Sequence, residues 1–341
     1  MDKLENRKAN HIELALQSRT GVSQVDPRFH YEPLLSAHPV NGLKPIHILG
    51  KELRVPMWVS SMTGGSKLAG TINRNLAMAC HEFGMGMGLG SCRIIMEDDT
   101  HFEDFNMRKI IGDHLPLWAN LGIAQVEELV DKRKVDRIIQ LVEKLQADGL
   151  IVHVNPMQEW FQPEGDTLRM QPLETIKRLL ERFTYPVIVK EVGQGMGPES
   201  LRELLRLPLQ AIELGAFGGT NFARLELLRN DKTLRDLYEP LVVIGESAAD
   251  MLGYINDIVS NEDPLCKELI LSGGIRTYLD GYYLIKKSTL NSVYGMASTF
   301  MKHARDDYSQ LRDFVDGQVK GLEMAEAYLT IKETDSRDAA H

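Results

Sequence analysis

The sequence predicts an α/β fold built on a parallel β-sheet, and two observations indicate it. Short apolar runs alternate with amphipathic stretches of helical periodicity along most of the 341 residues, which is typical of successive βαβ units. The runs also lack strict alternation of apolar and polar residues, as expected for strands covered on both faces. A closed eight-stranded barrel and a doubly wound open sheet both fit, and both place ligands at the carboxyl ends of the strands.

Nine apolar runs are candidate strands, one more than a closed eight-stranded barrel requires. They are Met57–Met62, Met85–Leu89, Leu117–Gly122, Leu150–Asn155, Val187–Val192, Ala211–Gly215, Leu241–Ile244, Leu269–Ser272 and Ser292–Met296. We expect Leu241–Ile244, inside the long connection after the sixth run, to be the one that is not a barrel strand. Helical periodicity marks Val126–Ala147, Leu173–Phe183 and Glu199–Leu205.

Composition indicates a globular chain that binds small molecules. Apolar residues make up 43% and charged residues 26% of the chain, which is ordinary for a protein with a sizeable core. The net charge of −9 argues against nucleic-acid binding, which needs a basic face. It does not exclude a small anionic ligand, because a local basic cluster can bind phosphate on an acidic protein.

The cysteines and the first residues bear on the compartment. Cys80, Cys92 and Cys266 stand alone, so we expect neither a disulfide framework nor a structural zinc site. The charged start MDKLENRKANHIELAL does not resemble a signal peptide. No stretch of 18 apolar residues occurs. We therefore expect a cytoplasmic protein that does not span a membrane.

Two glycine-containing motifs lie at the first two strand candidates: one follows the first strand, and the other contains the second. SSMTGG, residues 60–65, offers hydroxyls and close backbone approach to a ligand; the alternative is a tight strand-to-helix turn. In GMGMGLGSCR, residues 84–93, the four glycines have the period of a strand and are expected on one face. A flat ligand could lie against that face, with tight core packing as the alternative. Ser91 and Arg93 at the strand exit could hold an anion.

The motif HVNPMQEWFQPEGD, residues 153–166, ends a strand and opens a polar loop. His153 and Asn155 close the strand, and Gln158 and Glu159 follow. Mg²⁺ commonly binds one or two carboxylates together with substrate phosphates, so Glu159 is a candidate metal ligand. The alternative is a solvated loop acid.

Lys190 and three glycine-rich turns mark the later strands. Lys190 ends an apolar run, so its ammonium needs a partner or a shifted pKa. Gly-Gly-Thr, Ser-Gly-Gly and Ala-Ser lie at the ends of the last three expected barrel strands. Backbone N–H groups at such turns bind phosphate in barrels. At the start of the chain, Arg7, Lys8 and His11 form a basic cluster; a solvated terminus is the alternative.

Together these motifs resemble the type 2 isopentenyl-diphosphate isomerase family. The resemblance rests on NRKANHI, SSMTGG, GLGSCR, HVNPMQE, VKEVGQGM, GGTNF and SGGIRT in that order, from Arg7 to about Thr299. It implies a single FMN-binding (β/α)8 barrel over residues 1–341, with an N-terminal substrate-binding arm of about residues 1–30 and a short polar tail. It also implies interconversion of isopentenyl and dimethylallyl diphosphate by reduced FMN as acid/base, with Mg²⁺ on the diphosphate, NADPH as reductant, and a homotetramer or larger assembly.

The resemblance also implies roles for individual residues. The flavin would contact Ser61, Met62, Thr63, Ser91, Asn120 and Lys190, with Thr220, Gly273, Gly274, Ala297 and Ser298 at its phosphate end. The substrate would be bound by Arg7, Lys8, Ser91, Arg93, Gln158 and Glu226. The catalytic set would be Gln158, His153, Asn155 and His11, with Glu159 on Mg²⁺.

Three segments depart from the family pattern. Gly215 stands where the family usually has a serine, so a hydroxyl toward the FMN phosphate is missing. The connection from Leu241 to Ser247 contains VVIGES in place of a Trp-Gly-Ile-Pro type segment. The turn KKSTLNSVYG lacks the usual Ala-Leu-Gly-Ala pattern.

Two other functions are alternatives to the isomerase. An FMN-dependent 2-hydroxy-acid oxidase on the same barrel would need a histidine base beside a late arginine, and no histidine lies near Arg276. A flavin- or phosphate-binding regulatory protein without catalysis would not need Gln158, Glu159, Lys190 and the basic arm.

Overall fold

The computed structural model describes residues 3–61 and 64–332, without the side chains of residues 3–6, 8 and 9. Met62, Thr63 and the side chain of Lys8, all predicted site groups, lie outside the described residues. The chain divides into two compact units: residues 37–327, and a terminal unit of residues 1–36 with 328–341.

The terminal unit combines both ends of the chain. It contains the helix α1 (Lys3–Ala15), the short 3-10 helix η1 (Val22–Gln24) and the strand β1 (Phe29–Tyr31). β1 pairs antiparallel with β12 (Leu329–Ile331). Because the arm is helical, Arg7 and His11 lie one turn apart, and both are exposed.

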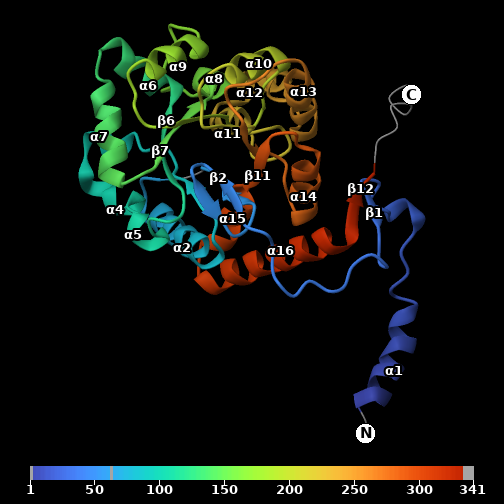
Figure 1. The fold of residues 1–341 in the computed structure, drawn as a ribbon. Helices are drawn as coiled ribbons and strands as arrows, with labels where there is room; N and C mark the ends of the chain where they lie inside the picture. The colour runs from blue at the N-terminus through green and yellow to red at the C-terminus, as the bar shows by residue number, and fades with distance from the viewer. Residues whose placement is uncertain (1–2, 62–63, 333–341) are drawn as a thin grey trace. The chain divides into compact units, whose positions relative to one another are not determined.

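The larger unit is a closed barrel of eight parallel strands, in the order β10-β11-β4-β5-β6-β7-β8-β9 (Figure 1). The strands are β4 (Met57–Val59), β5 (Gly86–Gly88), β6 (Leu117–Gly122), β7 (Gly149–Val154), β8 (Val187–Glu191), β9 (Ala211–Glu213), β10 (Glu268–Ser272) and β11 (Asn291–Met296). β11 pairs with β4 and closes the sheet. The predicted barrel is confirmed, and Leu241–Ile244 is indeed not one of its strands.

Helices follow each strand and surround the barrel (Figure 1). They are α2 (Lys67–Phe83), α3 (Ile94–Glu97), η2 (Asp99–His101), α4 (Phe102–Phe105), α5 (Arg108–Ile111), α6 (Ile123–Asp131), α7 (Val135–Leu145), α8 (Pro156–Phe161), α9 (Pro172–Leu180), α10 (Pro198–Leu205), α11 (Phe222–Arg229), α12 (Lys232–Val242), α13 (Ala248–Asn261), α14 (Tyr278–Lys287), α15 (Ser298–Ala304) and α16 (Tyr308–Tyr328). Leu241 and Val242 thus end the helix α12.

The helical periodicity seen in the sequence corresponds to buried stripes. In α7 the buried residues are Val135, Ile138, Leu141, Val142 and Leu145, the spacing of one helix face. The stretch of helical periodicity Val126–Ala147 is helical, but it spans two helices, α6 and α7. Arg133 has a φ of +54°, a left-handed conformation that ends α6 before α7 begins.

The packing of the barrel interior explains why glycines occur on β5 and β7. Trp58 on β4 lies opposite Gly86 on β5 in the strand register, and Trp118 on β6 lies opposite Gly149 on β7. A Cβ atom on Gly86 would lie 2.6 Å from the Trp58 ring, and one on Gly149 would lie 2.4 Å from the Trp118 ring. Each indole therefore occupies space that only a glycine leaves open.

The expectation that four glycines form one ligand-facing surface was wrong. Gly84 is the left-handed C-cap of α2, with a φ of +74°, and β5 covers only Gly86–Gly88. The flat group that lies over Gly86 is the Trp58 indole. At this position the alternative interpretation, tight core packing, is the one the structure shows. Met85, Met87 and Leu89 are buried, as expected.

A short hairpin lies at the amino ends of two barrel strands. β2 (Ile46–Ile48) and β3 (Lys51–Leu53) pair antiparallel. Leu49 and Gly50 between them both have positive φ, as a type I′ turn requires. The Leu49 N–H donates to the Glu268 carboxylate at 2.9 Å, and the Asn291 amide donates to the His47 carbonyl at 2.9 Å. Glu268 and Asn291 begin β10 and β11, so the hairpin is held at that end.

Arg108 is a buried charge that ties several segments together near the start of β6. Its guanidinium donates to the carbonyls of Gln146, Gly112 and Leu115 at 2.7–2.9 Å. It also pairs with the Asp148 carboxylate at 2.9 Å. Asp148 in turn accepts from the Leu117 N–H at 2.9 Å, so the pair links β6 with the residue before β7.

We predict that Arg108→Ala lowers the free energy of unfolding by about 3 kcal/mol, because it removes the buried guanidinium that pairs with Asp148 and donates to the Gln146 and Gly112 carbonyls. Urea denaturation measures the change. Lys320→Ala is the control, since Lys320 and Asp316 form an exposed pair on α16 whose loss should cost less than about 0.5 kcal/mol. Equal losses in the two variants would contradict the structural role of Arg108.

Candidate active site

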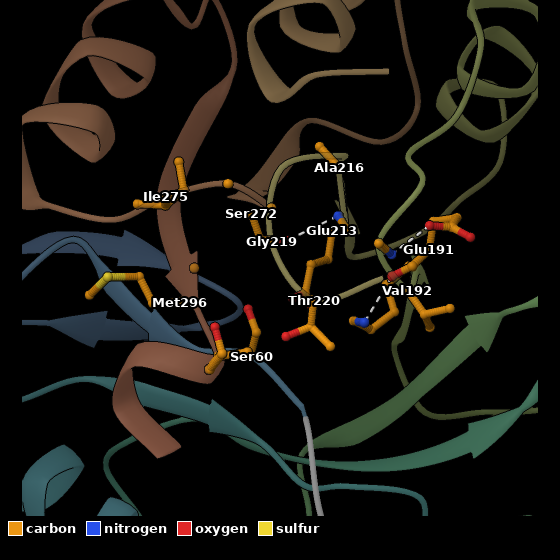
Figure 2. A pocket seen from close by; sticks show the side chains of 18 of the residues that line it. Ser60, Glu191, Val192, Glu213, Ala216, Gly219, Thr220, Ser272, Ile275 and Met296 are labelled. Carbon is orange, nitrogen blue, oxygen red and sulfur yellow. Dashed lines mark hydrogen bonds between the residues drawn. The ribbon is translucent and has the colours of Figure 1, made fainter. Parts of the chain in front are cut away.

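A cavity opens at the carboxyl ends of five barrel strands. Its empty volume is about 540 Å³, and part of this volume is open to solvent. Its lining comes from the ends of β4, β8, β9, β10 and β11 and consists of Ser60, Ser61, residues 190–193, Glu213, Gly215, Ala216, Gly219, Thr220, Phe222, residues 272–275 and residues 295–298. Figure 2 shows the side chains around this cavity, with Ser60, Glu213 and Thr220 among them. We call it the rim cavity.

Glycine-rich turns form one wall of the rim cavity. Gly273 and Gly274 after β10 have φ values of +96° and +72°. A Cβ atom on Gly273 would lie 2.2 Å from the Ala216 carbonyl oxygen. The turns after β9 and β10 therefore contact each other backbone to backbone, which leaves main-chain groups at the wall where side chains would otherwise stand.

Several buried polar groups in the rim cavity lack a hydrogen-bond partner among the described residues. They are the hydroxyl groups of Ser60 and Ser61 and both carboxylate oxygens of Glu213. Glu213 is fully buried. An unpaired buried carboxylate costs several kcal/mol, and these groups are free to bind polar atoms of a ligand.

Lys190 and Glu191 at the end of β8 line the cavity together with the start of the loop that follows. The Lys190 ammonium lines the cavity and donates to the Glu191 carbonyl at 2.8 Å, and Glu213 is its register partner on β9. The Glu191 carboxylate accepts the N–H groups of Gly193, Gln194 and Gly195 at 2.6–3.0 Å. Burial raises the pKa of Glu191, and these N–H groups oppose the shift.

A second group of polar side chains lies at the ends of β6 and β7. The His153 Nδ1 lies 2.7 Å from the Asn120 Oδ1. Because that partner is an amide oxygen, Nδ1 carries the proton and Nε2 is left as an acceptor. Burial, and secondarily the charge of Lys190, lower the pKa of His153 to about 3. The ring is therefore neutral at pH 7.

Asn155 organises the side chains of α8. Its amide nitrogen donates to Gln158 Oε1 at 3.1 Å and to Glu159 Oε1 at 3.0 Å. Gln158 Nε2 donates to Glu226 Oε1 at 3.4 Å, and Arg229 pairs with Glu226 at 3.2 Å. Four of the predicted residues thus form one hydrogen-bonded network across β7, α8 and α11.

Comparison with known proteins adds a decisive observation. No family model matches the chain. The isopentenyl-diphosphate delta-isomerase of Deinococcus radiodurans is 34% identical over 283 residues, covering 81% of this chain and 80% of the relative. The enzyme of Mycolicibacterium gilvum is 32% identical over 282 residues, with 81% and 79% covered. That of Rickettsia felis is 31% identical over 323 residues, with 93% and 90% covered.

The chain belongs to the isopentenyl-diphosphate delta-isomerase family. This confirms the resemblance drawn from the motifs and the prediction that the protein is an isomerase enzyme. Solved structures agree with the fold. A mandelate oxidase variant with a monooxide FMN adduct matches with a TM-score of 0.56 at 15% identity, covering 98% of this chain and all of that one. A flavocytochrome b2 variant with sulfite matches with 0.58 at 16%, covering 88% and 71%.

The structure places the isomerase family's expected residues in four locations. Those that line the rim cavity are Ser61, Lys190, Thr220, Gly273, Gly274, Ala297 and Ser298. Those in or beside the second network are Asn120, His153, Asn155, Gln158, Glu159 and Glu226. Ser91 and Arg93 are exposed after β5. Arg7 and His11 lie on α1 of the terminal unit, so their approach to the barrel stays a prediction.

Several residues of this region were not singled out from the sequence. Glu191 and Asp166 accept several hydrogen bonds, and Glu213 presents an unpaired buried carboxylate to the rim cavity. Their neighbours in the sequence carry no signal for these positions. Asp166 was noted only as the end of its motif. Its carboxylate accepts from Arg93 at 2.8 Å and from Gln125 at 2.9 Å, side chains far away in the sequence.

Gly215, the departure from the family pattern, has a physical reason in this chain. Its φ is +54°, and a Cβ atom there would lie 2.0 Å from the Glu191 carbonyl oxygen. A serine would not fit in this backbone conformation. The Gly215 N–H donates to Ser272 Oγ at 3.0 Å, which keeps a hydroxyl beside this part of the cavity.

Metal ligands and membrane spans were sought in the described part of the chain. No cluster of three or more His, Cys, Asp or Glu side chains there forms a ready-made metal site. No helix between residues 3 and 332, apart from the undescribed 62–63, has the length and apolar character to cross a membrane.

We predict that His153 makes stability fall as the pH is lowered. Its folded pKa is about 3 and its ordinary value is 6.5, so between these values the unfolded chain binds the extra proton and unfolding is favoured. From pH 7 to pH 5 the wild type should lose about 1–2 kcal/mol relative to His153→Gln. Urea denaturation at both pH values measures this. A pH-independent difference between the two proteins would show that His153 is not held neutral.

Proposed function

We propose that this family member interconverts isopentenyl diphosphate and dimethylallyl diphosphate, with reduced FMN as acid/base and Mg²⁺ on the diphosphate. The observation that carries the proposal is the similarity to named isomerases over most of the chain. FMN appears by name in a neighbour of the same fold. NADPH as reductant and a cytoplasmic homo-oligomer, tetramer or larger, also belong to the proposal.

The rim cavity fits a flavin mononucleotide. Its unpartnered groups, the hydroxyls of Ser60 and Ser61 and the Glu213 carboxylate, can meet the polar edge and the hydroxyl chain of such a cofactor. Thr220, Gly273, Gly274, Ala297 and Ser298 would bind its phosphate through hydroxyl and main-chain N–H groups. Lys190 would add a positive charge beside the ring.

Glu159 fits the role of a single carboxylate ligand for Mg²⁺. Its Oε1 accepts from Asn155 at 3.0 Å and its Oε2 from the Asp166 N–H at 2.9 Å. Both oxygens are thereby oriented and each keeps a lone pair for a cation. Mg²⁺ bound by one carboxylate would complete its shell with diphosphate oxygens and water.

The reaction requires a proton to be added at one carbon of an unactivated alkene and removed from another. Reduced FMN, when bound, supplies this acid/base chemistry and electron density for a cationic transition state. The protein residues would position the substrate. Gln158, fixed by Asn155 and Glu226, would orient the alkene end. His153 is neutral at pH 7, so it would accept a hydrogen bond and is unsuited to be the acid.

The diphosphate end would be bound by basic side chains. Arg93 follows β5 and is exposed, so its guanidinium is available to phosphate oxygens in addition to its contact with Asp166. From the family resemblance, Arg7 and Lys8 of the arm are proposed as further diphosphate ligands, and His11 as a residue of the catalytic set. Phosphate binding by several cations agrees with an acidic protein, because the positive charge is needed only locally.

An anaerobic assay tests the proposed reaction. Isopentenyl diphosphate is incubated with the protein, FMN, Mg²⁺ and NADPH, and dimethylallyl diphosphate is followed. We expect product when the flavin is reduced and none when it is oxidised, because there is no net redox change and only the reduced ring is the proposed acid/base. A yellow protein that forms no product under either condition would refute the isomerase function while leaving flavin binding in place.

We predict that Gln158→Ala lowers kcat by at least about 100-fold, the usual contribution of a positioned acid/base or orienting group, while FMN remains bound. Turnover and the visible absorbance of the flavin are measured on the same sample. Gln162→Ala is the matched control one turn further along and should retain full activity. An unchanged rate in Gln158→Ala would refute the substrate role of this residue.

A further inference from the structure

Asp166, in the loop between α8 and α9, joins three consecutive strand-to-helix connections of the barrel. Its Oδ2 accepts from Arg93 Nη1 at 2.8 Å and from Gln125 Nε2 at 2.9 Å. Arg93 follows β5, and Gln125 lies in α6 after β6. The backbone N–H of Asp166 donates to Glu159 Oε2 at 2.9 Å, and Glu159 lies in α8 after β7. One residue is therefore the common partner of groups from three neighbouring strands.

The contact between Arg93 and Asp166 is poorly suited to stabilise the fold. The side chains are 57% and 41% exposed, and such surface ion pairs contribute little to stability. The loop also has a separate anchor. The buried carboxylate of Glu127 on α6 accepts the N–H groups of Arg169 and Met170 at 2.9 and 3.3 Å. Holding the loop in place therefore does not depend on the contacts of Asp166 alone.

Two of the three groups that Asp166 contacts, Arg93 and Glu159, are those that a metal-bound diphosphate would use at this edge of the barrel. Glu159 offers a carboxylate for a divalent cation. Arg93 is engaged by Asp166 through Nη1, so its other N–H donors remain for phosphate oxygens. Neither side chain is fixed by burial, because Arg93 is exposed and Glu159 is partly exposed. Their relative placement depends on what contacts both of them.

We propose that Asp166 is a positioning residue for a magnesium diphosphate: its carboxylate holds Arg93, and its N–H orients Glu159, so that one ligand can bind both. The proposal rests on the proposed function in so far as the ligand is the diphosphate end of that substrate. Gln125 contributes by holding the Asp166 carboxylate from the second side.

Gly122, at the end of β6, leaves space for the same arrangement. A Cβ atom on Gly122 would lie 2.4 Å from Gln125 Oε1 and 2.9 Å from His153 Nε2. The absent side chain therefore leaves room for both Gln125 and His153 at the end of β6. Through Gln125, the position of Asp166 is connected to the part of the site that contains His153.

The test measures binding of inorganic pyrophosphate with Mg²⁺ to the full chain by isothermal titration calorimetry. Asp166→Ala should weaken binding about tenfold, as expected for the loss of a charge-assisted contact. Asp166→Asn should stay within about threefold of wild type, because an amide oxygen can accept from both Arg93 and Gln125. Should Asp166→Ala not fold, Asp166→Ser replaces it.

Glu127→Gln is the matched control, since Glu127 anchors the same loop without contacting Arg93 or Glu159 in the described structure. It should lower the melting temperature but leave the affinity within about twofold. A double-mutant cycle asks whether Asp166 acts through Arg93. Added to Arg93→Ala, the Asp166→Ala change should cost less than about threefold in affinity, because the shared contact is already lost.

The proposal would be overturned by no pyrophosphate binding by the wild type, by unchanged affinity in Asp166→Ala, or by the same loss in Glu127→Gln as in Asp166→Ala. A full tenfold effect of Asp166→Ala in the absence of Arg93 would also overturn it. Because binding is measured without turnover, an inactive wild type that binds pyrophosphate through Asp166 would refute only the isomerase function.

Discussion

The pairing of β11 with β4 is the constraint on which the rest of the structure depends. These strands are separated by more than two hundred residues, and their register brings Tyr294 opposite Met57 and Met296 opposite Val59. Closure brings Ser60 and Ser61 after β4 to the same rim cavity as Ala297 and Ser298 after β11. Without it the two ends of the sheet would be edges, and the cavity would lack one of its walls.

Closure also requires the barrel interior to be filled. The fully buried indoles of Trp58 and Trp118 each lie across a glycine of the neighbouring strand, at Gly86 and Gly149. Large side chains opposite glycines fill a narrow interior at high density. The glycines that look like a ligand surface in the sequence are therefore part of the support on which the site is built.

The barrel rim divides its polar groups between two neighbourhoods. The ends of β4 and β8–β11 present hydroxyls, main-chain turns and Lys190 around a cavity with unpartnered buried groups. The connections after β5, β6 and β7 present a hydrogen-bonded set of amide, carboxylate and guanidinium groups. We propose the first as the site of the cofactor and the second as the site of the diphosphate with its cation. This division fits what a family of isomerases acting on a diphosphate requires.

The sequence by itself determined the alternation of strands and helices and most of the polar residues at the rim, because burial and turn chemistry leave local patterns. It also indicated that Leu241–Ile244 is not a barrel strand. It did not distinguish a barrel from an open sheet without the family resemblance, since no local pattern encodes which distant strands pair. It misjudged Gly84 and Gly86, whose surroundings are set by a helix end and by Trp58. Only the tertiary structure placed Asp166 between Arg93, Gln125 and Glu159, because contacts across 73 and 41 residues depend on three strands lying side by side.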